Sequence, residues 1–307
     1  MLLGLSCGQP RGSAEILLKC ALSAAADGGA EVELLRLDDL HLPSGPDAPE
    51  PDDAWWFWER LVECDGLIIS TPIISRTITG RLKLLGDRLL GPNADVAIIR
   101  ELVAAREAGR EPVVPFRVDE RVLKPRVGGF IAVGGSLTSQ WKTLALPVLH
   151  TMTFSMQTAI ADQVVFEGAG TPQSIVLDDA ALERAALLGR NVASQLGRAF
   201  EHVEYRGEPG ICPMCHLDVV VLRGTEVECA TCGARGTLCV DGGTVRVGFT
   251  EEGCRSSVIS LHEKREHFFE IQETAARHRA LREEIDAGAA AYDTFSFAAP
   301  PRSETRS

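Results

Sequence analysis

Residues 2–13 read LLGLSCGQPRGS, an apolar segment that runs directly into a loop of small and polar residues. The apolar part predicts a buried strand, and the roughly 3.6-residue spacing of apolar side chains in residues 14–26 predicts a helix with Ser13 as its N-cap. Such a loop leaves backbone N–H groups unpaired at the positive end of the helix dipole. Because Ser6 adds a hydroxyl and Arg11 a cation, the loop is either a phosphate site or an ordinary tight turn.

Two further loops of this kind follow buried strands. Residues 67–70 and 127–133 are continuous apolar runs, typical of strands covered on both faces, and they lead into polar loops at 71–80 and 134–141. We also predict strands over 31–37 and 158–166, and helices over 54–64, 81–90, 94–109, 142–153 and 178–200. This alternation indicates an α/β fold, a doubly wound parallel sheet with right-handed crossovers. Ligands bind such sheets at the carboxyl ends of the strands, where all three loops are expected.

Charge and hydropathy exclude several classes of protein. The chain of 307 residues has 31 Lys and Arg against 43 Asp and Glu, a net charge of −12 that disfavours binding to nucleic acid or to anionic membranes. No apolar run approaches the roughly 20 residues of a membrane span, and the N-terminus lacks the layout of a signal peptide. We therefore expect a cytoplasmic protein with no nucleic-acid partner and no membrane partner.

The first two hundred residues resemble the flavodoxin-like NAD(P)H-dependent FMN reductases, including the flavoprotein part of the iron–sulfur flavoproteins. The resemblance rests on residues 4–13, on 71–83 with Asp87 and Arg88, and on 134–136, in this order and at this spacing. It implies that the first loop holds the FMN phosphate, that the second runs along the flavin ring, and that the third flanks its far side. It also implies NAD(P)H as co-substrate.

Carried over position by position, the resemblance assigns three groups of residues to FMN. These are Ser6, Arg11, Gly12 and Ser13 in the phosphate loop, Thr71, Pro72, Ile73, Ile74 and Ser75 along the isoalloxazine, and Gly134, Gly135 and Ser136 completing the pocket. Four more residues lie in or just after these loops and are candidates for contact with a substrate: Arg76, Trp141, Lys142 and His150. On its apolar helix, His150 is also a candidate core residue.

The implied function is that of an FMN-dependent oxidoreductase, which passes hydride from NAD(P)H through the flavin to a quinone, a flavin or a dedicated metabolite. The insertion at 92–126 and the C-terminal half exceed what a simple reductase needs, which favours a dedicated organic substrate. The alternative is a non-catalytic flavin-binding redox sensor or a zinc-braced interaction protein, favoured by Ile74, which stands where the family often has an aromatic residue. A scaffold without flavin is a third interpretation. By analogy with the family, we expect a homodimer or homotetramer.

Two C-x2-C pairs stand thirteen residues apart in the second half of the chain: Cys212 with Cys215, and Cys229 with Cys232. Each pair can present two thiolates, and a hairpin predicted over 218–223 and 226–228 brings the pairs together for tetrahedral Zn²⁺. The segment resembles a zinc ribbon, and we rank a rubredoxin-type iron site behind zinc because its pairs are usually set further apart. Four cysteines indicate a structural metal. Residues 205–250 hold four basic and five acidic residues, so this ribbon lacks the charge of a nucleic-acid site.

The expected domain organisation follows from these segments. It comprises a flavin-binding domain at 1–203 with the insertion at 92–126, a zinc ribbon at 204–250, a C-terminal helix at 251–288 and a flexible tail at 289–307. The C-terminal helix carries an apolar seam that includes Phe268 and Ile271, and this seam packs either on its own domain or on a second copy.

Overall fold

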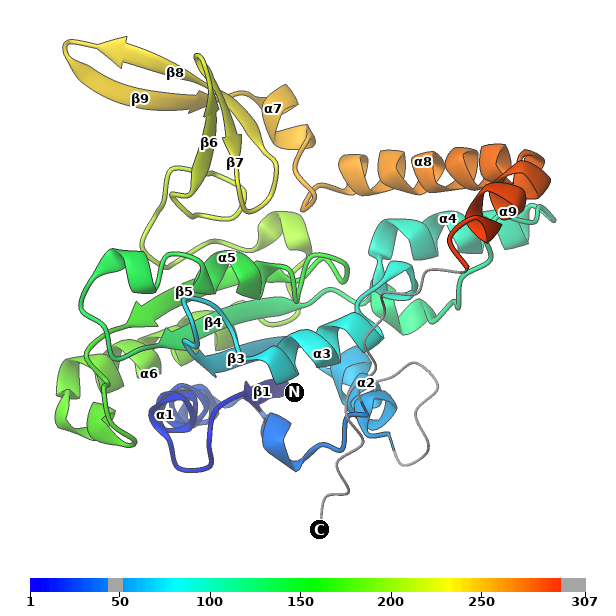
Figure 1. The fold of residues 1–307 in the computed structure, drawn as a ribbon. Coiled ribbons are helices and arrows are strands. Elements are labelled where there is room, and N and C mark those ends of the chain that lie inside the picture. The colour runs from blue at the N-terminus through cyan, green and yellow to red at the C-terminus, as the bar shows by residue number, and fades with distance from the viewer. Residues whose placement is uncertain (44–51, 294–307) are drawn as a thin grey trace.

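Five parallel strands form the central sheet of the computed structural model, which describes residues 1–43 and 52–293 (Figure 1). The strand order is β2-β1-β3-β4-β5. The strands are β1 (Leu2–Ser6), β2 (Val32–Arg36), β3 (Gly66–Pro72), β4 (Val127–Val133) and β5 (Ala159–Phe166). This is the flavodoxin-like order: β2 is added on one side of β1, and β3, β4 and β5 are added on the other side. The predicted fold class is therefore confirmed.

Helices cover both faces of the sheet. One face packs on α1 (Ser13–Asp27) and α6 (Asp179–Ala193), and the other on α2 (Ala54–Glu63), α3 (Gly80–Leu89) and α5 (Ala145–His150). Successive strand residues point to opposite faces of the sheet. Leu2 and Ile68 pack on the side of α1 and α6, while Leu3 and Ile69 pack on the side of α2, α3 and α5. Burial on both faces explains why these strands are continuous apolar runs.

Several predicted helices are shorter in the structure. The helix predicted over 94–109 is α4 (Val96–Glu107), because the Asp95 side chain accepts from the N–H groups of Ala97 and Ile98 and fixes the helix start there. The helix predicted over 142–153 is reduced to α5 and the turns that follow it. The helix predicted over 178–200 ends at Ala193, ahead of a residue with positive φ, Gly197 (79°).

The second half of the chain builds an antiparallel sheet that lies over α5 (Figure 1). Its strands are β6 (Val220–Arg223), β7 (Glu226–Cys229), β8 (Arg235–Asp241) and β9 (Thr244–Phe249), in that order. We call residues 205–249 the cysteine ribbon. The hairpin predicted over 218–223 and 226–228 is confirmed as β6 and β7. The second hairpin, β8 with β9, is a feature that the sequence analysis missed.

The C-terminal segment forms three helices in place of the one predicted over 251–288: α7 (Glu251–Arg255), α8 (Leu261–Ala280) and α9 (Arg282–Ala290). Figure 1 shows α8 running from the ribbon to α4, within the insertion. Phe268 of α8 packs with Ile98 and Leu102 of α4, so the apolar seam contacts its own chain. The buried Lys264 ammonium donates to Asp95 Oδ2 at 3.1 Å and fixes the same junction.

Some sequence predictions fall outside the described residues. Residues 44–51, and residues 294–307 of the predicted tail, lie outside them. Over the ranges 1–43 and 52–293, none of the helices has the length and apolar character needed to cross a bilayer.

Candidate functional site

Strand register brings the three predicted loops to one edge of the sheet. Ser6, the last residue of β1, lies opposite Ser70 of β3, and Pro72 at the end of β3 lies opposite Val133 at the end of β4. The main chain continues these contacts beyond the strands, since the N–H of Ile73 donates to the Val133 carbonyl at 2.8 Å. The loops after β1, β3 and β4 therefore lie side by side at the carboxyl ends of the strands, where ligands bind.

The loop after β1 contains two buried hydroxyls, those of Ser6 and Ser13, that have no hydrogen-bond partner in the described part of the chain. The prediction that Ser13 is the N-cap is wrong, because Gly12 occupies that position and its carbonyl accepts from the N–H of Ile16 at 3.0 Å. The Ser13 hydroxyl is thereby left without a capping role. An unpaired buried hydroxyl costs about 1–3 kcal/mol, so this pair fits a ligand rich in acceptor oxygens, such as a phosphate.

The backbone of the same loop is held in a tight turn. Arg11 has a φ of 64°, in the left-handed region that a non-glycine residue rarely adopts, and its side chain is exposed. The N–H of Gly12 donates to the Gln9 carbonyl at 2.9 Å, and a Cβ at Gly12 would lie 3.0 Å from that carbonyl oxygen. A side chain at this position would crowd the turn, which favours glycine there.

Glu15 lies behind this loop and is completely buried, a site feature that the sequence analysis missed. Arg36 donates to its carboxylate through Nε at 2.7 Å and Nη2 at 3.1 Å, and the Lys19 ammonium lies 2.5 Å away. The Arg36 hydrogen bonds, with further ones from Lys19 and the Arg11 backbone, hold the pKa of Glu15 at about 2. Glu15 thus links the loop to α1 and β2. The sequence signal that could have pointed to Glu15 is a carboxylate placed next to the apolar stripe of the predicted helix.

We expect Glu15→Gln to destabilise the fold and to change its response to acid. A carboxyl whose folded pKa is depressed stabilises the protein fully above its ordinary pKa of 4.5, and this contribution is lost as the pH falls through about 2. Near neutral pH, the free energy of unfolding of the variant should be about 2 kcal/mol lower than that of the parent protein. Urea unfolding of both proteins at about pH 7 and about pH 3 measures this, with the exposed Glu31→Gln as control. Equal stability of the variant and the parent protein at both pH values would contradict the assignment.

A cavity of about 290 Å³ lies between the second and third loops. Its lining residues are Ile73, Ser75, Arg76, Gly134, Gly135, Ser136, Trp141, Lys142 and Phe166. All but Phe166 are predicted site residues, so the structure brings together residues from both loops. We call this space the loop cavity. A Cβ at Gly135 would lie only 2.9 Å from the Cα of Gly170, which explains the need for glycine in the third loop.

Polar contacts hold the loop cavity in shape. Arg76 Nε donates to the Gln140 carbonyl at 2.6 Å and so joins the second loop to the third. The Lys142 ammonium is paired with the Glu167 carboxylate just after β5. Ser75 and Arg76 both have positive φ, 47° and 78°, in a turn that Ile74 and Thr77 close by backbone hydrogen bonds. Such backbone strain is common in loops that bind ligands.

The remaining predicted residues do not line this cavity. Thr71 is buried and its hydroxyl donates to the Pro72 carbonyl at 3.0 Å, while the Ile74 side chain is 53% exposed. A Cβ at Gly8 would contact the Pro72 ring at 3.3 Å, so the first loop touches the second. None of the first-loop residues lines the loop cavity itself.

His150 is placed elsewhere. It is buried, with its ring 5.0 Å from that of Phe130 and its Nε2 2.9 Å from Gln163 Oε1. Burial lowers the pKa of His150 to about 4, so the imidazole is neutral near pH 7. It lines a different cavity of about 230 Å³ beneath the cysteine ribbon, together with Tyr205 and His216. The loop cavity receives no contact from it.

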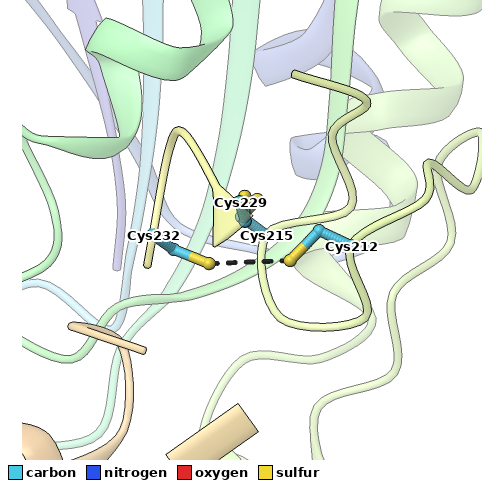
Figure 2. Close-up of side chains that lie close together, drawn as sticks. All are labelled: Cys212, Cys215, Cys229 and Cys232. Atoms are coloured by element: carbon cyan, nitrogen blue, oxygen red, sulfur yellow. Dashed lines mark hydrogen bonds between the residues drawn. The ribbon is translucent and has the colours of Figure 1, made fainter. Parts of the chain in front are cut away.

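The four predicted cysteines converge in the ribbon (Figure 2). Their sulfur atoms all lie within 4.8 Å of one another, with 3.6 Å between Cys212 and Cys232 and 3.4 Å between Cys215 and Cys229. All four are buried. Tetrahedral zinc with Zn–S bonds of about 2.3 Å requires sulfur atoms about 3.8 Å apart, so the cluster has the size of such a site. His216 stacks on Tyr205 with ring centroids 3.8 Å apart and lies outside the cluster.

A parallel sheet in this order, with ligand loops at the ends of β1, β3 and β4, defines the protein as a flavodoxin-like α/β protein. The model of the family described as NADPH-dependent FMN reductase matches residues 1–170, and the chain belongs to this family. It is accordingly an NAD(P)H-dependent FMN oxidoreductase, which sets the alternative of a non-catalytic module aside.

Three individual proteins show how far the similarity extends. Flavone synthase cfoJ of Aspergillus candidus is 36% identical over an alignment of 292 positions that covers 88% of this chain and 88% of the other. The solved structure of a flavone reductase is 31% identical, covers 98% of this chain and 99% of the other, and superposes with a TM-score of 0.82. An iron–sulfur flavoprotein of Methanocaldococcus jannaschii is 26% identical over an alignment of 200 positions that covers 60% of this chain and 91% of the other. The first two similarities therefore include most of the residues beyond 170.

Proposed function

We propose that the protein uses NAD(P)H to reduce a planar phenolic acceptor of the flavone class. The observation that carries this proposal is the nearly full-length similarity to two proteins named for flavones, which extends through the cysteine ribbon and the C-terminal helices. A flavone carries a carbon–carbon double bond conjugated to a carbonyl group. Its reduction consumes one NAD(P)H and one proton: hydride adds to the carbon distant from the carbonyl, and the proton adds to the adjacent carbon. The products are the saturated flavanone and NAD(P)⁺.

The residues present fit FMN. The unpaired Ser6 and Ser13 hydroxyls, the Arg11 guanidinium and the backbone around Gly12 would hold its phosphate at the start of α1. Residues 71–75 and 134–136 would flank its ring, with glycines that permit close approach. When bound, FMN supplies the capacity to accept and to donate hydride. The chain itself positions the reactants, and Trp141 and Phe166 give the cavity wall its aromatic surface.

Lys142 has the chemistry to act on the acceptor directly. Its ammonium lines the loop cavity and is oriented by the Glu167 carboxylate. As hydride adds to the conjugated double bond, negative charge develops on the carbonyl oxygen of the acceptor. A hydrogen bond from a fixed ammonium stabilises that charge, so we assign Lys142 to bind the acceptor carbonyl.

Lys142→Met is expected to lower kcat for flavone reduction by about tenfold to a hundredfold, because it removes a donor to the developing oxyanion. FMN should remain bound, since the phosphate loop is unchanged. Lys83→Met is the matched control, because Lys83 also pairs with a carboxylate, Asp87, but on the surface of α3. Steady-state kinetics measures the effect, and an unchanged kcat in Lys142→Met would remove Lys142 from this role.

The acceptor class is tested by comparing apigenin, a hydroxylated flavone, with menadione and free FMN as acceptors under anaerobic conditions. We expect apigenin to be consumed in equal amount with NADPH, to give the saturated product, and to have a kcat/KM at least about tenfold above that of menadione. NADPH oxidation supported by menadione or free FMN but not by apigenin would show a general flavin or quinone reductase instead.

We further propose that the cysteine cluster binds Zn²⁺ as a structural ion and that the protein is a homodimer or homotetramer. The zinc proposal is supported by four buried sulfur atoms at tetrahedral spacing. The predicted division into domains at 1–203, 204–250 and 251–288 is likewise a proposal. Metal analysis and sedimentation of the purified protein test the first two, and iron in place of zinc would identify a rubredoxin-type site.

A further inference from the structure

A second cavity of about 590 Å³ lies between the sheet and the cysteine ribbon. One wall comes from the third loop, α5 and β5 and includes Lys142, Thr143 and Glu167. The opposite wall comes from the ribbon and includes Tyr205, His216 and Leu217. We call this space the ribbon cavity. Its size is typical of small-molecule sites, whereas the loop cavity has about half its volume.

The two cavities adjoin at Lys142, which lines both of them. Along β5 and its end, Phe166 lines the loop cavity while its neighbours Val165 and Glu167 line the ribbon cavity. The Lys142–Glu167 pair therefore stands at the boundary between the two spaces. A ligand whose carbonyl reaches Lys142 from the loop cavity has the ribbon cavity directly beyond it.

The ribbon wall is fixed to the sheet by a chain of buried hydrogen bonds. Gln163 of β5 donates from Nε2 to the Cys215 carbonyl at 2.8 Å, and its Oε1 lies 2.9 Å from His150 Nε2. On the ribbon side, the rings of Tyr205 and His216 are stacked, with an angle of 11° between their planes. The wall thus presents aromatic and apolar surface in a defined position, which suits a flat aromatic ligand.

The charges of the ribbon cavity disfavour NAD(P)H as its ligand. Both cations in its lining, Lys142 and Arg184, already have carboxylate partners: Glu167 pairs with Lys142, and Asp162 accepts from Arg184 Nη2 at 2.6 Å. The lining further contains the carboxylates of Glu208 and Asp218. The pyrophosphate of NAD(P)H requires cations or free N–H donors, so this excess of acceptors suits a neutral ligand with hydroxyl groups.

We propose that the ribbon cavity is the distal subsite for the acceptor and holds the hydroxylated aryl ring that projects from the reducible ring system. The proposal rests on the proposed function, and it makes the ribbon a wall of the substrate site. Residues on the two sides of the cavity then determine how well an extended acceptor binds. A compact acceptor such as menadione needs only the loop cavity.

The test is to fill the ribbon cavity with a large side chain. Thr143 lines this cavity and is exposed, so Thr143→Trp adds an indole without opening the core. The matched control is Thr151→Trp, at an exposed threonine just after α5 that lines neither cavity. Both native hydroxyls donate to a nearby backbone carbonyl, so the two substitutions lose similar hydrogen bonds. Val219→Trp fills the cavity from the ribbon side if the first variant fails to fold.

We expect Thr143→Trp to raise KM for apigenin at least about tenfold while kcat with menadione and KM for NADPH stay unchanged. Thr151→Trp should match the parent protein with every substrate. Equal KM for apigenin in both variants and the parent protein would overturn the subsite. If the parent protein reduces menadione but not apigenin, this result overturns the proposed function and, with it, the subsite that rests on it.

Discussion

Replacing Ser13 with aspartate is expected to weaken FMN binding by at least about a hundredfold, equivalent to about 2.7 kcal/mol. The Ser13 hydroxyl is buried without a partner in the described chain, as is that of Ser6. A carboxylate there would stand against the phosphate, and like charges in close contact cost several kcal/mol. The helix dipole favours a carboxylate in the first turn and offsets part of its burial cost, and circular dichroism of the variant checks that it folds. Titration of flavin fluorescence measures the dissociation constant.

Two controls make this result specific to the phosphate. Ser23→Asp places the same charge on an exposed turn of α1 and should bind FMN normally. Riboflavin lacks the phosphate, so its weaker affinity should be equal in the parent protein and Ser13→Asp. An equal loss of affinity for riboflavin and FMN would show a distorted loop, and unchanged FMN affinity would place the phosphate elsewhere.

Cys229→Ser is expected to remove the bound zinc and to unfold the cysteine ribbon. The core around the four cysteines has few other buried apolar side chains, Leu217, Ala234 and Ile259, with Val227 buried nearby in β7. A core of this size rarely folds without its metal. The remainder of the chain has separate cores on both faces of the sheet and should keep its FMN. Metal analysis and limited proteolysis measure the two effects, with new cleavage expected within residues 205–249.

The control for this substitution is Cys239→Ser. Cys239 lies on β8, is exposed and stands outside the cluster, so its replacement should change neither metal content nor cleavage. Since Leu217 and His216 form part of the ribbon cavity, Cys229→Ser should also lose apigenin reduction while menadione reduction persists. A fully folded ribbon in metal-free Cys229→Ser protein would contradict a structural role for the ion.

The parts of the fold predicted most accurately are those fixed by local sequence. Strand β4 begins and ends where predicted, Val127–Val133, because both of its faces are buried and a proline and glycines flank it. The two C-x2-C pairs were predicted from the sequence as directly, since a metal site requires a fixed ligand spacing. The β8–β9 hairpin was missed although its Gly242-Gly243 turn, with φ of 57° and 83°, is a typical hairpin signal.

Other features depend on contacts between distant segments. The turn that Gln9 closes decides whether Ser13 or Gly12 caps α1. The sequence of β5 likewise does not reveal that Phe166 lines a cavity. Gln163 is a further case, since its partners come from α5 and from the ribbon, 52 residues away in the case of Cys215. The ribbon cavity exists only through this placement and has no sequence signature.

The most direct test of the central claim follows bound FMN through one turnover without oxygen. Addition of one equivalent of NADPH is predicted to bleach the visible flavin absorbance, and subsequent addition of apigenin is predicted to restore it while one equivalent of the saturated product forms. Reduced flavin that persists with apigenin but is reoxidised by menadione would contradict the flavone acceptor, and a protein that does not bind FMN at all would contradict the account as a whole.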